Sequence, residues 1–387
     1  MSEWKKVKLK DCCHSISDGD HLPPPKSNSG VPFVTIANID ATNHIDFGNT
    51  MFVPLEYYNN LNDIRKAKCN DILYSVVGSF GKPVLIKENI PFAFQRHIAI
   101  LRPNNEIADS RFLYYVMLTR DFFMQADTVA IGAAQRTISL TALRNMEVKL
   151  PSMETQYRIA NILSRYDSLI ENYQKQIKLL GEAAQRLYKE WFIDLHFPGH
   201  ENTNIIDGVP EGWEKKSVDS IYNIKYGKNL STKLITETGF YPVYGANGVI
   251  GYYDKANCNE QVVLITSRGN GSGDVLMTYH KDAFITNNSF IVTPSEGFEY
   301  CKLPFTFQFL KMANFRAVRT GAAQPQLTNQ SIHTVDVILP NKNLIEKFCS
   351  ATIGMNDTII KYREQIRLLT EARDRLLPKL MSGEIEV

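Results

Sequence analysis

The side chains of this sequence that could do chemistry are hydrogen-bonding groups placed at the ends of short, apolar, β-branched runs. Arginine and lysine fit the O6/N7 edge of guanine, and asparagine and glutamine fit the N6/N7 edge of adenine. We therefore predict that such groups form a DNA-contacting surface. Its predicted members are Ser79, Lys82, Gln95, Arg96, Gln135 and Arg136 in the first half of the chain, and Arg268, Asn270, Asn287, Asn288, Gln324 and Gln326 in the second.

These polar groups occupy matching places in the two halves but differ in identity, which is expected if two surfaces read different bases. The alternative is that the Asn, Gly and Ser residues only form turns. One element, Gly-Ala-Ala-Gln, is identical at 132–135 and 321–324. It either packs a domain onto the following helix or presents Gln135 and Gln324 to backbone phosphate.

Catalytic motifs are not found in the sequence. It contains no phosphate-binding G-x-x-x-x-G-K-[ST], no H-E-x-x-H and no G-x-S-x-G. The glycine-rich stretch 269–274 precedes a strand-like run at 275–278, whereas a nucleotide-binding loop opens a helix. We interpret it as a turn. The eight histidines are not grouped at metal-ligand spacing. The sequence therefore predicts a non-catalytic chain with no metal and no cofactor of its own.

The elements that position the candidate residues occur twice. With an offset of 321 − 132 = 189, residues 132–192 and 321–381 share 17 identities in 61 positions, where average composition would give about four. A repeat of this length indicates two copies of one structural unit. Two similar units suggest two readers of a target that itself has two parts.

Each copy consists of a β-rich block and a helical block. Residues 1–150 and 208–340 contain short β-branched and aromatic runs bounded by Gly, Pro and Asn, which is typical of strands. The first block also predicts one helix over Arg111–Gln125. Apolar residues then recur every three or four positions over 153–194 and 342–377, so we expect rods, the first about 60 Å long. Pro378 is expected to end the second rod.

The fold class that follows is α+β. Two β-rich target-recognition domains are joined by two long antiparallel helices that form a coiled coil, with a pseudo-twofold internal repeat. We expect the two β domains at opposite ends of the rods, facing the same side. The predicted boundaries are 1–151 for the first recognition domain, 152–195 for the first spacer helix, 196–340 for a linker and the second recognition domain, and 341–387 for the second spacer helix and C-terminal tail.

Composition indicates an ordinary soluble globular protein, because 44% of residues are hydrophobic and 22% are charged. The net charge of +2 means that any nucleic-acid contact must come from local patches. Six scattered cysteines without a C-x-x-C pair are typical of reduced thiols in a cytoplasm. We expect no secretion signal and no apolar run of the roughly 18 residues that cross a membrane.

The block order and three motifs resemble the DNA-specificity subunit of type I restriction–modification enzymes. The motifs are the Gly-Trp start at Glu211–Trp213, the Leu-Pro step at Leu150–Pro151 and Leu339–Pro340, and the ending Arg375–Ile385. The resemblance implies that each β domain is a target-recognition domain and that the helices set the spacing of a bipartite, asymmetric DNA site. One departure is domain length: Trp4 to Gly132 is 128 residues, and Trp213 to Gly321 is 108.

The resemblance also implies partners. A subunit of this family is not an enzyme but recruits two adenine methyltransferase subunits and two motor–nuclease subunits. S-adenosylmethionine, ATP and Mg are then expected only on those partners, in the cytoplasm. Two other classes stay open at this point. One is a self-sufficient methyltransferase or nuclease, whose motifs we do not find. The other is a non-enzymatic coiled-coil protein with two ligand-binding β domains outside restriction–modification.

Overall fold

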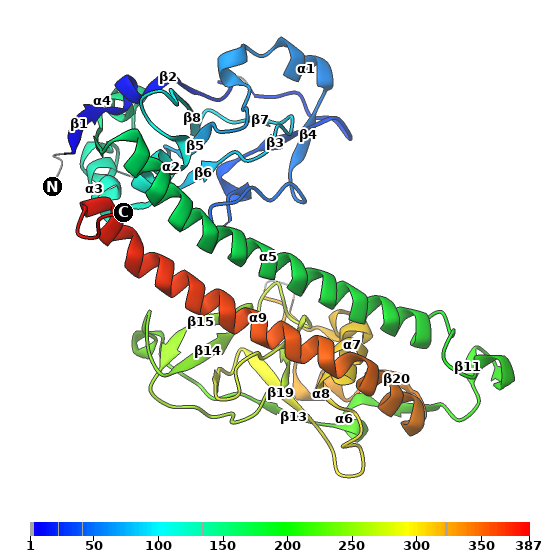
Figure 1. The fold of residues 1–387 in the computed structure, drawn as a ribbon. Helices are drawn as coiled ribbons and strands as arrows, with labels where there is room; N and C mark the ends of the chain where they lie inside the picture. Colours follow the sequence, from blue (N-terminus) through cyan, green and yellow to red (C-terminus); the bar gives the residue numbers. More distant parts are fainter. Residues whose placement is uncertain (1–3, 22, 41, 134, 322–323) are drawn as a thin grey trace. The chain divides into compact units, whose positions relative to one another are not determined.

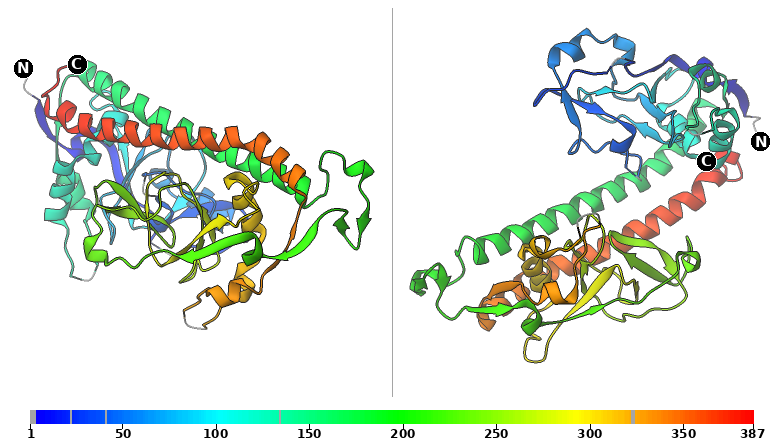
Figure 2. Two further views of the ribbon diagram at one scale, coloured as in Figure 1. Left: turned by 90° about the horizontal axis from the view of Figure 1, so that it is seen from below. Right: turned by 180° about the vertical axis from the view of Figure 1, so that it is seen from behind.

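The computed structural model describes residues 4–21, 23–40, 42–133, 135–321 and 324–387. Ser2 and Glu3, and the alanines at 134, 322 and 323 of the repeated element, lie outside the described residues. The chain forms two compact units: unit 1 comprises residues up to 170 together with 368–387, and unit 2 comprises 171–367. Two long helices, α5 (Met153–Phe192) and α9 (Lys342–Ser382), each contribute one part to each unit (Figures 1 and 2).

Unit 1 is built on a four-stranded sheet with the order β2-β8-β5-β6, a three-stranded sheet β4-β3-β7 and a β1-β9 pair. Strand β5 is buried along its whole length because both faces of the larger sheet are covered. The strands are β1 (Lys5–Lys8), β2 (Cys13–Asp18), β3 (Val31–Val34), β4 (Met51–Val53), β5 (Ile72–Ser75), β6 (Pro83–Leu85), β7 (Ala93–Phe94), β8 (Ile98–Pro103) and β9 (Glu147–Leu150).

The helices of unit 1 differ from the sequence prediction at one place. The single helix expected over Arg111–Gln125 is two helices that break at Thr119, whose hydroxyl accepts a hydrogen bond from the Phe122 amide at 3.3 Å. A local side-chain cap therefore restarts the helix in a new direction. The helices are α1 (Leu55–Asn60), α2 (Ser110–Leu118), α3 (Arg120–Val129) and α4 (Leu140–Asn145).

Unit 2 contains the same sheets in the same strand order: β13-β19-β16-β17, β15-β14-β18 and β12-β20, with an additional β10-β11 hairpin. Its elements are β10 (Ile205–Ile206), β11 (Val209–Pro210), β12 (Glu214–Ser217), α6 (Val218–Ile221), β13 (Tyr222–Tyr226), β14 (Tyr241–Gly245), β15 (Gly248–Tyr253), β16 (Val263–Thr266), β17 (Val275–Met277), β18 (Phe284–Ile285), β19 (Ser289–Pro294), α7 (Leu303–Met312), α8 (Asn329–Ile332) and β20 (Asp336–Leu339).

Within each unit, α5 and α9 lie side by side. In unit 2 the rings of Tyr173 and Tyr362 stack with centroids 4.7 Å apart, and those of Tyr188 and Phe348 meet at 5.8 Å. Because the residue number rises on one helix while it falls on the other, the helices are antiparallel there. In unit 1, Arg373 of α9 donates a hydrogen bond to Asp167 of α5 at 2.8 Å.

The second long helix does not stop at Pro378, as the sequence predicted, but continues to Ser382. Pro378 lies four residues before the C-terminal end of α9 and, because it has no N–H, removes one backbone hydrogen bond of the helix. Leu377 and Leu380 are buried in the core of unit 1, and this burial offsets that loss. The helix is closed by Gly383, which adopts a φ of 74°. No helix in the described part of the chain has the length and apolarity of a membrane span.

Candidate nucleic-acid interface

Three segments of unit 2 meet at one end of its four-stranded sheet. The Ser267 amide, just after β16, donates to the Asn288 carbonyl just before β19 at 2.8 Å. The Leu327 amide donates to the Ser267 carbonyl at 2.7 Å, and Arg268 forms an isolated antiparallel bridge with Gln326. We call residues 267–270, 286–288 and 324–327 the polar end of unit 2.

Unit 1 makes the same backbone connections. The Val76 amide donates to the His97 carbonyl at 2.9 Å, and the Ile138 amide donates to the Val76 carbonyl at 2.8 Å. An isolated bridge joins Val77 to Thr137. The polar end of unit 1 is therefore formed by residues 76–79, 95–97 and 135–138. The shared bonds make Val77 equivalent to Arg268, His97 to Asn288, and Thr137 to Gln326.

Most of the predicted contact residues come together at these two ends. In unit 1, Arg96 and Gln135 are exposed and line one cavity of about 300 Å³, together with Asp18, His97 and Thr137. In unit 2, the Arg268, Asn270, Gln324 and Gln326 side chains are exposed, and those of Asn287 and Asn288 are half-buried. Gln95 is half-buried at its place in the polar end of unit 1.

Ser79 and Lys82 lie apart from that cavity, in the turn between β5 and β6. The Ser75 hydroxyl donates to the Ser79 carbonyl at 3.0 Å and accepts from the Lys82 amide at 2.9 Å, so both residues help to close this turn. The corresponding stretch 269–274 joins antiparallel β16 and β17. The interpretation of that glycine-rich stretch as a turn is thereby confirmed.

Arg136 is held by neighbouring groups. Its guanidinium pairs with the Asp127 carboxylate, donates to the Asp127 carbonyl and lies 5.3 Å from the centre of the Phe80 ring. The Phe80 ring in turn stacks on Phe123 with centroids 5.9 Å apart. This arginine therefore joins the β5–β6 turn to α3, and we leave it out of the contact set proposed below.

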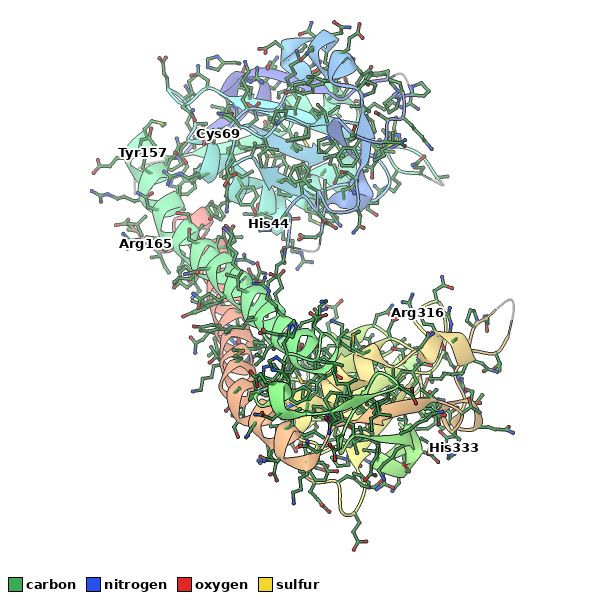
Figure 3. The ribbon with its side chains drawn as sticks, turned by 90° about the vertical axis from the view of Figure 1, so that its right-hand side faces the viewer. His44, Cys69, Tyr157, Arg165, Arg316 and His333 are labelled. Carbon is green, nitrogen blue, oxygen red and sulfur yellow. The ribbon has the colours of Figure 1, made fainter. Side chains whose placement is uncertain are left out.

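The structure adds two basic residues to the polar end of unit 2 that sequence reasoning missed. The Lys228 carbonyl accepts from the Asn287 amide at 3.1 Å, and the Arg319 guanidinium donates to the Asn270 carbonyl at 3.4 Å. Beside Arg319, Arg316 pairs with Asp274 at 2.5 Å (labelled in Figure 3). Lys228 could have been found from the sequence, because the pair Gly227-Lys228 follows the first strand of its sheet just as Gly19-Asp20 does in unit 1.

At the place of Lys228, unit 1 has Asp20, whose carbonyl accepts from the Arg96 amide at 3.1 Å. The Asp20 carboxylate accepts from the Tyr57 hydroxyl at 2.5 Å and pairs with Arg65 at 3.4 Å. Burial and this hydrogen bond to a carboxylate raise the pKa of Tyr57. The same Arg65 lies 3.7 Å from Asp18. The two polar ends thus have one backbone frame but opposite charge at this position.

Within the residues that the structure describes, no three His, Cys, Asp or Glu side chains gather as a metal site would require. The geometry at each polar end is that of exposed and half-buried donors and acceptors at one end of a sheet. Such an arrangement can hold a ligand by hydrogen bonds, as base edges are held in the grooves of DNA.

Comparison with known proteins decides the family. The model of the type I restriction modification DNA specificity domain matches residues 1–180 and 210–363. The chain belongs to this family. It resembles the type I restriction enzyme MjaIX specificity subunit of Methanocaldococcus jannaschii, with 28% identity over 305 residues, covering 72% of this chain and 69% of that one. The putative MjaX specificity subunit of the same organism is 23% identical over 413 residues, covering 100% and 94%.

A solved structure gives the fold of this family. The S subunit of a type I restriction–modification system from M. genitalium matches with a TM-score of 0.58 and 19% identity, covering 97% of this chain and 96% of that one. The chain is accordingly a DNA-specificity subunit of mixed helix and strand. The alternative of a binding protein outside restriction–modification is not favoured by these matches.

Proposed function

We propose that this specificity subunit reads a bipartite, asymmetric DNA sequence, one half with the polar end of each unit. The observation that carries the proposal is that one backbone frame presents different side chains in the two units: Val77, His97 and Thr137 against Arg268, Asn288 and Gln326. A shared frame approaches DNA in the same way, while different side chains select different bases.

The side chains suggest which bases are read. In unit 2 we assign Arg268 to the O6/N7 edge of guanine and the Asn287–Asn288 pair to adenine. In unit 1 we assign Arg96 to guanine, because it is exposed beside the cavity that Gln135 also lines. Ser79, Lys82, Gln95, Asn270, Gln324 and Gln326 stay in the proposed set as flanking contacts.

We further propose that the long helices separate the two readers. Helix α5 has 40 residues and α9 has 41, which at 1.5 Å per residue gives rods of about 60 Å. Rods of that length correspond to about 1.7 turns of B-DNA at about 3.4 Å per base pair, and we propose that they allow both readers to contact one duplex. The recognition domains would then be residues 1–151 and 196–340, the latter including its linker, with spacers at 152–195 and 341–387.

The proposed role in the complex is recognition and assembly without catalysis. Two adenine methyltransferase subunits and two motor–nuclease subunits would bring S-adenosylmethionine, ATP and Mg, in the cytoplasm. Support comes from the family and from the polar ends, which offer hydrogen bonds for recognition. Adenine methylation requires the base to leave the stack at a cost of a few kcal/mol, which binding by the two readers can help to offset.

The experiment that tests the proposal is single-molecule mapping of methylated adenines in cells with and without this chain. We expect a two-part sequence with a fixed gap to be methylated only when the chain is present. Methylation that is unchanged on deletion of the chain, or confined to one uninterrupted short sequence, would contradict the proposal.

The contact at Arg268 can be tested on its own. Arg268→Ala is expected to weaken binding to the mapped target by about 1–3 kcal/mol, roughly five- to 150-fold, with little change on random duplex. Arg316→Ala is a matched control, because Arg316 belongs to the same unit and its guanidinium pairs with Asp274. Affinities measured by fluorescence anisotropy decide: equal losses on both duplexes would show that Arg268 contacts phosphate.

A further inference from the structure

Unit 2 contains a second surface that adjoins its polar end. A cavity of about 560 Å³ follows β13 from Lys228 past Lys225 to Asn223, and its other wall is formed by residues 257–260. Ile291 and Thr293 of β19 also line it. We call this hollow the β13 groove.

The charge of the β13 groove is set by its two lysines. Lys225 and Lys228 are both exposed, and in the described part of the chain neither ammonium forms an ion pair with a carboxylate. Glu260 is the acidic member of the lining, and the asparagines at 223, 257 and 259 add neutral amides. An unpaired ammonium group on a flexible stem acts as a point charge for phosphate.

Backbone hydrogen bonds connect the groove to the polar end. The Lys228 amide donates to the Ile285 carbonyl at 2.9 Å, and its carbonyl accepts from the Asn287 amide at 3.1 Å. Lys225 pairs in register with Ile291, three residues further along the sheet from Asn288. The groove therefore begins at the residue that contacts Asn287 and continues along β13 past Lys225.

Unit 1 differs at these positions. The strand registers align Ser17 of β2 with Ile100 and Lys225 of β13 with Ile291, so Ser17 is equivalent to Lys225. Asp20 replaces Lys228, and its carboxylate engages Tyr57 and Arg65. The positive groove is thus a property of unit 2, although the two sheets have the same strand order.

We propose that the β13 groove binds the phosphate backbone of the DNA that flanks the half-site read by unit 2, with Lys225 and Lys228 each neutralising one phosphate. This inference rests on the proposed function, because it requires a duplex at the polar end. The lysines carry no base information. They hold the DNA on unit 2 before and during sequence recognition, and they make that hold dependent on salt.

The test is a salt titration of the full-length chain with a mixed-sequence duplex. A phosphate contact contributes about 0.9 to the slope of log affinity against log salt, so Lys225→Gln with Lys228→Gln should reduce that slope by about 1.8. The control pair is Lys302→Gln with Lys347→Gln, which are exposed lysines of unit 2 outside the groove lining. The control pair should leave the slope unchanged, and both double variants should keep the thermal unfolding curve of the original chain.

The outcomes separate the two proposals. A reduced slope for the groove variant, with the same methylated sequence in cells, supports phosphate binding by the groove. If the original chain binds duplex with a salt-dependent affinity and the groove variant keeps that slope, the groove assignment is overturned while the proposed function stands. If the original chain does not bind duplex even at low salt, both are overturned.

Discussion

Exchanging residues 208–340 for the corresponding segment of another family member is expected to replace one half of the methylated sequence and to leave the other half unchanged. The exchanged segment contains the whole polar end of unit 2 and its sheets β13-β19-β16-β17, β15-β14-β18 and β12-β20, and it separates only the short β10-β11 hairpin from its first strand. The polar end of unit 1 is formed by residues 76–138, outside the exchange. The result is read by mapping methylated adenines in cells.

The exchange has a structural condition and a control. Phe305 of α7 lies with its ring centroid 5.5 Å from that of Phe192 on α5, and Phe348 on α9 meets both. The donor segment must therefore supply an aromatic residue at the place of Phe305, or the new domain will not pack on the helices. The reciprocal exchange of residues 1–151 should replace the other half. A change in both halves from either exchange would refute independent readers.

The repeated architecture could be predicted from the sequence because the two halves keep the same apolar periodicity although most of their residues differ. The short β-branched runs expected in 1–150 and 208–340 appear as strands such as β5 and β16, and the two long apolar repeats appear as α5 and α9. These elements are set by burial of their own side chains, and burial leaves a local pattern. The exact helix ends were less predictable. Leu380, buried against residues far away in the chain, keeps α9 helical beyond Pro378.

The pairing of individual contact residues was less predictable because it depends on backbone bonds between distant segments. The sequence indicated matching places for the polar groups of the two halves but not which residue corresponds to which. The backbone bonds of Ser267 and Val76 make Val77 the equivalent of Arg268. Arg136 was assigned to DNA by residue type, and only its contact with Asp127 reveals a competing partner. Residue type indicates what a side chain can bind, whereas the fold decides whether it is available.

In each unit a glycine directly follows the first strand of the four-stranded sheet, β2 or β13. At this point the backbone passes close to the end of β7 in unit 1 and to the end of β18 in unit 2. A Cβ atom added to Gly227 would lie 2.3 Å from the Thr286 carbonyl oxygen, and one added to Gly19 would lie 2.2 Å from that of Phe94. Neither glycine adopts a positive φ, so the requirement is for close approach rather than for an unusual conformation. At 227 the approach brings the Lys228 carbonyl within hydrogen-bond distance of the Asn287 amide.

Gly227→Ala should therefore push the backbone of Thr286 and Asn287 away from the end of β13. The atoms that would clash are backbone oxygens, which cannot rotate away, so we expect a loss of about 3 kcal/mol or more in the free energy of unfolding of unit 2, at the upper end for overpacking. Binding to the mapped target should weaken as well, because the polar end loses its frame. Scanning calorimetry and anisotropy measure the two effects.

A second glycine of unit 2 provides the matched control. Gly354 lies within α9 and is exposed, and no atom lies within 4 Å of a Cβ added there. Gly354→Ala should stabilise the helix by up to about 1 kcal/mol and leave DNA binding unchanged. If Gly227→Ala were as stable and as active as Gly354→Ala, the close approach at the end of β13 would not set the geometry of the polar end, and its proposed link to DNA binding would be refuted. The positions of Lys228 and of the Asn287–Asn288 amides thus depend on the close backbone approach at Gly227, and the Gly227→Ala substitution tests that dependence.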